Sequence, residues 1–215
     1  MRWVASRDAR NVVRISDVFG PGGFKNPEER KSPQPPPPSV KESVGTPLTK
    51  ESPRLHEEKR LQEEADALYT EGLSLIQGLF EKARREEVLP TEVALEFVKK
   101  TLLFMASEGD FLLVFASAIS SGNFLYAHSL NVLIFSLKVG FGLRYDKPQL
   151  IELGLAAFLH DIGMSKIPEE ILNKTEPLTP EELDQVRQHP FYSVSLLEKT
   201  KELEPIILHA ISQAH

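Results

Sequence analysis

Apolar residues recur with helical spacing along the chain from about residue 55 onward. In residues 55–88 they are separated by intervals of three, four or seven, with charged residues between them: Leu61, Ala65, Leu68, Leu75 and Leu79. This spacing places apolar side chains on one face of a helix. We therefore predict a helix over 55–88, which the proline at position 90 prevents from continuing.

The same pattern predicts further helices in the rest of the chain. They are expected over 91–107, 110–121, 126–143, 147–163, 179–189 and 204–215, with one more starting at Pro190. The segment 147–163 is apolar almost all round between Leu150 and Leu159, which is typical of a helix buried on most sides.

Local signals predict where several of these helices begin and end. Thr179 is expected to cap the helix over 179–189, with Glu182 completing a capping box. Glycines are expected at the helix ends, with Gly140 and Gly142 ending 126–143 and Gly163 ending 147–163. The last predicted helix is still apolar-periodic at His215, so we expect that the natural chain continues beyond this residue.

These elements predict an all-α fold, a helical bundle preceded by a Pro-rich segment. No convincing strand pattern follows residue 55, and only a weak one precedes it, around Val12–Ile15. Residues 21–53 are rich in Pro, Ser, Lys and Glu and cannot bury enough apolar surface to offset their ordering entropy. We therefore expect residues 1–54 to be a disordered tail and linker, with the prolines 35–38 as a spacer or a docking segment.

Composition narrows the chemistry that is available. The net charge is −6 and the Lys and Arg residues are scattered, which argues against a nucleic-acid surface. There is no cysteine, so a metal site must use His, Asp or Glu. No secretory signal and no uninterrupted apolar run of about 18 residues is present, which favours a cytoplasmic protein without a membrane span.

One short motif places two polar groups at the end of an apolar stretch. In "FLHDIGMSKIP" (158–168), His160 and Asp161 follow the apolar run directly. Unpaired polar groups in an apolar setting cost about 2–7 kcal/mol each, so something should compensate them. A metal centre is one interpretation, because a carboxylate can bridge two cations while an imidazole binds one. A His–Asp hydrogen bond at the helix end is the other.

The other histidines do not separate these interpretations by themselves. His128 lies near the apolar side of its helix, where a histidine that is satisfied within the core is common, and His189 precedes a proline at a helix junction. His209 and His215 are six residues apart and lie on different faces of a helix, so at most one of them should join a shared site. His56 lies in a charged segment and is expected to be solvated.

The order of these residues resembles a known family. His128 in "YAHSLNV", then His160 and Asp161, then His189 followed by proline, resembles the HD-GYP branch of the HD phosphohydrolase superfamily. The likeness extends through "LHDIGMSKIPEEILNKTEPLTPEELDQVRQHP" and covers about residues 124–215. It implies a helical bundle with two or three metal ions, often iron or manganese, that hydrolyses cyclic di-GMP, a bacterial second messenger.

The resemblance implies roles for particular residues. The metal ligands would be His128, His160, Asp161, His189 and His215, with Asp161 bridging two cations. Phe124 and Leu125 occupy the turn where some members carry a glutamate for a third metal, so we expect two divalent ions. Residues 123–215 would form the metal-binding domain, and 55–122 a helical region that is either a separate input domain or part of the same bundle.

Three departures from the family pattern leave a second function open. The family commonly has a lysine after "HDIG", where this chain has Met164, and Lys166 is the nearest replacement to act on a phosphate. Ala214 stands where another histidine is expected, and the chain ends before the "DGxGYP" segment. The hypotheses are therefore a cyclic di-GMP phosphodiesterase and a degenerate module that binds a nucleotide or a partner protein without turnover. A phosphohydrolase acting on another nucleotide is disfavoured by the long resemblance, and a homodimer is compatible with either hypothesis.

Overall fold

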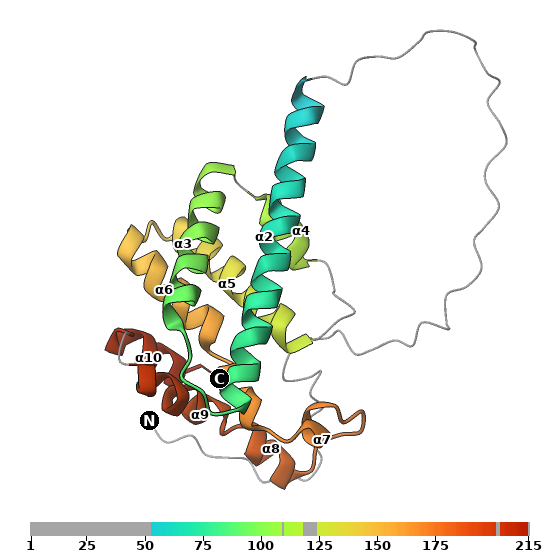
Figure 1. The fold of residues 1–215 in the computed structure, drawn as a ribbon, viewed down its shortest axis with the longest axis vertical. Coiled ribbons are helices and arrows are strands. Elements are labelled where there is room, and N and C mark those ends of the chain that lie inside the picture. The colour runs from blue at the N-terminus through green and yellow to red at the C-terminus, as the bar shows by residue number, and fades with distance from the viewer. Residues whose placement is uncertain (1–52, 109, 118–123, 201–202, 215) are drawn as a thin grey trace, which may run out of the picture.

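The computed structural model describes residues 53–108, 110–117, 124–200 and 203–214, and all regular secondary structure in these ranges is helical (Figure 1). The prediction of an all-α fold is therefore confirmed. The expectations for the tail and linker, including the strand at Val12–Ile15, lie outside the described residues. So do His215 and the last part of the helix predicted over 110–121.

The described helices follow the predicted order with shifted ends. They are α2 (Pro53–Arg84), α3 (Thr91–Glu108), α4 (Phe111–Ser117), α5 (Phe124–Gly142), α6 (Lys147–Leu159), α7 (Glu169–Leu172), α8 (Pro180–Val186), α9 (His189–Leu197) and α10 (Pro205–Ser212). Two 3-10 helices, η2 (Ile162–Lys166) and η3 (Glu198–Thr200), complete the set. The pattern had predicted neither of these nor the short α7, because elements of one turn carry no periodicity to detect.

One apolar core joins the first helices to the last ones. α5 packs most extensively against α6, and α3 and α10 cover other sides of α6. The core includes fully buried residues such as Phe80 of α2, Leu133 of α5 and Phe158 of α6. The first turns of α2 extend beyond this bundle, and residues 54–60 are all exposed (Figure 1). Within the described residues, the helical region before α5 therefore shares its core with the helices that follow it.

α5 combines a core position with an unusually apolar composition. Among the described helices it is the one long and apolar enough to cross a membrane by length and composition, and 44% of its apolar window is buried inside the molecule. It carries His128 and packs against α2, α4 and α6. The core helix of a water-soluble bundle has the same properties, so this composition alone does not indicate a membrane span.

The predicted end of α6 is wrong, whereas that of α5 is confirmed, because α5 ends at Gly142. α6 ends at Leu159 with His160 as its C-cap, and Gly163 lies inside η2 rather than at the end of α6. Gly140 lies within α5, where an added Cβ would approach Leu150 Cδ2 to 2.6 Å. Both glycines permit close packing between elements, which is a tertiary requirement that the local sequence does not reveal. The last helix also ends before the chain does, at Ser212.

The helix over Thr91–Glu108 and the capping box before α8 agree with prediction. Thr179 Oγ1 accepts a hydrogen bond from the Glu182 backbone N–H at 3.2 Å, and Glu182 Oε2 accepts one from the Thr179 N–H at 2.7 Å. The side chain of Lys174 also donates to Glu182, at 2.6 Å. These bonds satisfy N–H groups that a helix start leaves without a partner.

Candidate metal centre

Three helices bring three histidines to one aspartate. His128 lies in the second turn of α5, His160 caps the end of α6, and His189 is the first residue of α9. Asp161 follows His160 and is 0% exposed, and His160 and His189 are also buried. Residues that are 33 and 28 positions away from Asp161 in the sequence therefore meet it in the interior.

The imidazole Nε2 atoms all face the Asp161 carboxylate. His189 Nε2 lies 3.1 Å and His160 Nε2 3.3 Å from Asp161 Oδ1. His128 Nε2 lies 3.6 Å from the other oxygen, Oδ2. The two oxygens of one carboxylate thus face different histidines.

Backbone hydrogen bonds fix the tautomer of two of these rings. His160 Nδ1 lies 2.9 Å from the Ala157 carbonyl oxygen, and His189 Nδ1 lies 2.7 Å from the Val186 carbonyl oxygen. A carbonyl oxygen only accepts, so each Nδ1 carries the proton and donates it. In the neutral rings Nε2 then presents a lone pair toward Asp161. This second-sphere contact is the usual way in which a protein orients a histidine that binds a metal.

The donor set fits a cation between these side chains. A lone pair opposite a carboxylate oxygen requires positive charge between them, either as a proton on the ring or as a metal ion. Two ligand atoms that each lie about 2.1 Å from one transition-metal ion are roughly 3.0–3.4 Å apart, close to the spacings around Asp161 Oδ1. His128, His160 and Asp161 each offer a ligand atom within 4.8 Å of the others. The residues present therefore suit a divalent metal with N and O ligands.

The turn after α6 determines where Asp161 points. Asp161 leaves the helical conformation, with φ −96° and ψ 7°, a region in which many active-site residues are found. Its carbonyl accepts from the Met164 N–H at 2.8 Å and so starts η2. The helix predicted over 147–163 is therefore too long at its end, because α6 stops at Leu159 and Asp161 lies beyond its C-cap.

Gly163 allows α9 to reach this turn. A Cβ at position 163 would lie 2.1 Å from the His189 carbonyl oxygen and 2.4 Å from the Ser193 backbone nitrogen. The absence of a side chain is thus required for His189 to approach Asp161. Sequence reasoning missed this function of Gly163 because the contact joins residues 26 positions apart.

Lys166 points to a different carboxylate. Its Nζ donates to Glu86 Oε1 at 2.9 Å, in the connection between α2 and α3, and the contact holds the pKa of the Glu86 carboxyl below its usual value. Arg84 forms a second ion pair across the same junction, 3.1 Å from Glu169 of α7. Met164, which occupies the position where a lysine was expected, is 1% exposed and belongs to the apolar core.

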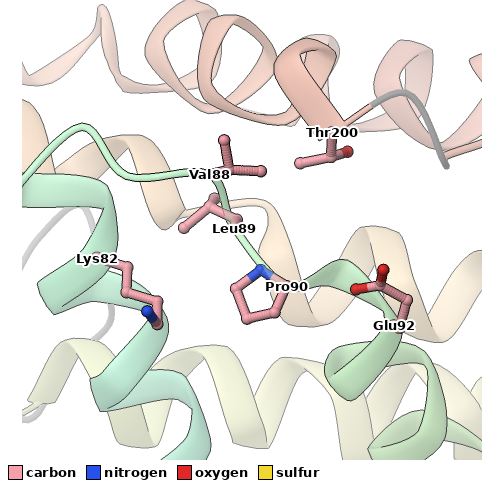
Figure 2. A pocket seen from close by; sticks show the side chains of 6 residues that line it. All are labelled: Lys82, Val88, Leu89, Pro90, Glu92 and Thr200. Atoms are coloured by element: carbon pink, nitrogen blue, oxygen red, sulfur yellow. The ribbon is translucent and has the colours of Figure 1, made fainter.

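His128, His160, Asp161 and His189 form what we call the His–Asp cluster. The remaining histidines that the structure describes lie outside this cluster. His56 and His209 are exposed, as expected for His56. A surface cavity of about 250 Å³ lies where the 88–90 segment passes Thr200, and Lys82 and Glu92 also line it (Figure 2). None of its lining residues belongs to the His–Asp cluster, so the cavity does not identify a substrate path to Asp161.

Comparison with known proteins finds a family match for the part of the chain that carries the His–Asp cluster. Residues 115–215 match the family model of the HD domain. A cyclic di-GMP phosphodiesterase of Pseudomonas aeruginosa is 26% identical over 151 residues, which cover 70% of this chain and 36% of the relative. The cyclic di-GMP phosphodiesterase PdeB of Borreliella burgdorferi is 29% identical over 150 residues, which cover 69% of this chain and 39% of the relative.

The chain thus spans less than two fifths of the length of these curated relatives. No solved structure matches it significantly. The matched residues 115–215 contain all four side chains of the cluster, with His160 and Asp161 as the adjacent His–Asp pair. Residues 115–215 of this chain thus match the HD domain, which agrees with the resemblance to the HD phosphohydrolases noted in the sequence.

Proposed function

We propose that this protein hydrolyses cyclic di-GMP at a pair of divalent metal ions, with iron or manganese as the favoured metals. The observation that carries the proposal is the buried Asp161 carboxylate, whose two oxygens face the Nε2 atoms of different histidines. The names of the two relatives and the HD domain support the substrate and the reaction class.

The proposed roles follow from the positions of the side chains. His160 and His189 lie beside Asp161 Oδ1 and His128 beside Oδ2, so the carboxylate is suited to bridge two ions. His215 is proposed as a further ligand from the resemblance alone. When bound, the ions would supply an activated water and positive charge for the phosphoryl oxygens. A protein of net charge −6 could then hold an anionic dinucleotide.

Lys166 is proposed to contact a phosphate of the substrate. To do so it must leave Glu86, and an ion pair between exposed side chains is weak because water screens it. Glu86 is well exposed and Lys166 is partly exposed, so breaking their ion pair costs little free energy. Lys166 would then replace the lysine that the family commonly carries at the position of the buried Met164.

A module that binds without turnover is the second candidate. The burial of Met164 and the pairing of Lys166 with Glu86 favour it, because position 164 then offers no lysine and Lys166 is engaged by another carboxylate. In that case the ligand would be cyclic di-GMP, a related nucleotide or a signalling partner protein, and a homodimer would be compatible with it. A cytoplasmic location is proposed for either function.

The test uses the complete gene product, purified without oxygen. Bound metal and cyclic di-GMP hydrolysis are measured for the wild type, for the double variant His160→Ala with Asp161→Ala, and for His209→Ala as a control histidine outside the cluster. Turnover with about two metals per chain, lost only in the double variant, is the expected result. Metal without turnover would favour the binding module, and the absence of both would refute the proposal.

A further inference from the structure

The Ser193 hydroxyl makes two hydrogen bonds across the turn after α6 that contains His160 and Asp161, which we call the HD turn. It donates to the His160 carbonyl oxygen at 2.6 Å and accepts from the Gly163 backbone N–H at 2.8 Å. Ser193 is 0% exposed and lies in the middle of α9. One side chain therefore bonds to backbone groups on both sides of Asp161.

This use of a helical serine is unlike that of two other buried hydroxyls on the described helices, Thr101 and Ser129. Serine and threonine inside a helix commonly bond to the carbonyl four residues earlier in the same helix. Thr101 bonds in this way to Phe97 and Ser129 to Leu125. Ser193 instead bonds across to the turn after α6.

The two backbone groups that it bonds lie at helix ends. His160 is the C-cap of α6 and Gly163 lies in the first turn of η2. Backbone groups at these positions lack a partner inside their own helix. Ser193 supplies one for each, and thereby ties the backbone on either side of Asp161 to α9.

We propose that Ser193 is a positioning residue of the metal centre, which sets the separation between Asp161 and His189. His189 and Ser193 are one turn apart on α9, so the helix that is tied to the turn by Ser193 also carries His189. The 3.1 Å spacing of His189 Nε2 and Asp161 Oδ1 then depends on this hydroxyl. The inference rests on the proposed metal-dependent function, and it adds a residue that binds no metal itself.

The test measures the metal site rather than catalysis. Co²⁺ is titrated into metal-free complete gene product, and its visible absorption reports the ligand geometry. Ser193→Ala removes the two hydrogen bonds, and Thr101→Val removes a buried hydroxyl that bonds only within α3. If Ser193→Ala fails to fold, Ser193→Cys, which nearly keeps the side-chain volume and replaces the hydroxyl by a weakly hydrogen-bonding thiol, is measured in its place.

We expect the Ser193 variant to bind Co²⁺ about tenfold more weakly, within the range found when a residue that supports a ligand is removed. Its saturated spectrum should also change, whereas Thr101→Val should match the wild type. A folded Ser193 variant with wild-type affinity and spectrum would overturn this inference and leave the proposed function intact. A wild-type protein that binds no Co²⁺ would refute the proposed function, and the inference with it.

Discussion

Replacement of Gly163 by alanine tests the packing that brings α9 to the HD turn. The new Cβ would lie 2.1 Å from the His189 carbonyl oxygen, 2.4 Å from the Ser193 nitrogen and 2.7 Å from Ser193 Oγ. The two closest neighbours are backbone atoms, so no side-chain rotation relieves the clash. α9 must move away from η2 by roughly 1 Å or more to restore ordinary contact distances.

The expected loss of stability combines three effects. Overpacking of a well-packed site typically costs about 1–3 kcal/mol, and a clash with backbone belongs at the upper end. Each hydrogen bond to Ser193 that breaks costs a further 0.5–1.5 kcal/mol or so. Alanine also restricts the unfolded chain, which offsets about 0.4–1 kcal/mol. We therefore expect Gly163→Ala to lower the free energy of unfolding by about 2–4 kcal/mol.

The assay is urea unfolding followed by far-ultraviolet circular dichroism, with a glycine control in the same chain. Gly78 lies in α2, and a Cβ there meets nothing within 4 Å. Gly78→Ala should therefore raise the free energy of unfolding by about 0.5–1 kcal/mol, the ordinary gain for this change inside a helix. Metal affinity should fall in Gly163→Ala and stay unchanged in Gly78→Ala.

A Gly163→Ala protein with wild-type stability and wild-type metal affinity would refute this reasoning. Such a result would mean that η2 and α9 can separate without cost, and that the position of His189 does not depend on their contact. A loss of stability in both variants would instead point to the mutation type rather than to the site.

Three further predictions concern a helix end, a carboxylate and a lysine. Arg144 follows α5 with φ 60°, a left-handed conformation that is strained for a residue with a side chain, and its backbone N–H bonds to the Phe141 carbonyl oxygen. Arg144→Gly should therefore raise the free energy of unfolding by about 0.5–1 kcal/mol in urea titrations. An unchanged or lower value would contradict this strain. The hydrogen bond from Lys174, and after it the one from the Thr179 backbone N–H, hold the pKa of the Glu182 carboxyl below its usual value. This carboxylate therefore stabilises the fold at pH values above its pKa in the unfolded chain, and the effect is lost as the pH falls through its pKa in the folded protein. Glu182→Gln should thus be less stable than the wild type at neutral pH, and unfolding curves at successively lower pH should converge; a gap that does not change with pH would contradict this assignment. Lys166→Met should leave the metal content unchanged and reduce cyclic di-GMP turnover about tenfold or more, and unaltered kinetics would remove Lys166 from the proposed site.

The helical content and several helix starts could be predicted because they depend on neighbouring residues. The spacing of apolar positions predicted the helices that became α2, α3, α5, α6 and α10. The capping box at Thr179 and Glu182 was confirmed since its two hydrogen bonds join residues three positions apart. Helix ends were harder, because the left-handed residues that follow α2 and α5 are the non-glycine residues Glu86 and Arg144.

The candidate site could be predicted only as a set of residue types. The adjacent His160 and Asp161 were identified from their place after an apolar run, and the resemblance added His128 and His189. Ser193 was missed, although a signal existed: in "HPFYSVSLL" it lies on the same helical face as Leu196 and Leu197, all of them buried. A polar residue on a buried face needs a partner, and its partners were 30 and 33 positions away.

The sequence by itself determined the all-helical class, the starts of several helices and the presence of histidines and one aspartate suited to a metal. These follow from hydrogen bonds and side-chain spacing within one or two turns of chain. Only the tertiary structure decided that Asp161 lies beyond the end of α6, that Gly163 admits α9, and that Lys166 pairs with Glu86. These features depend on contacts between distant segments, whose distances are set by how the whole core packs and are not encoded in any short stretch of sequence.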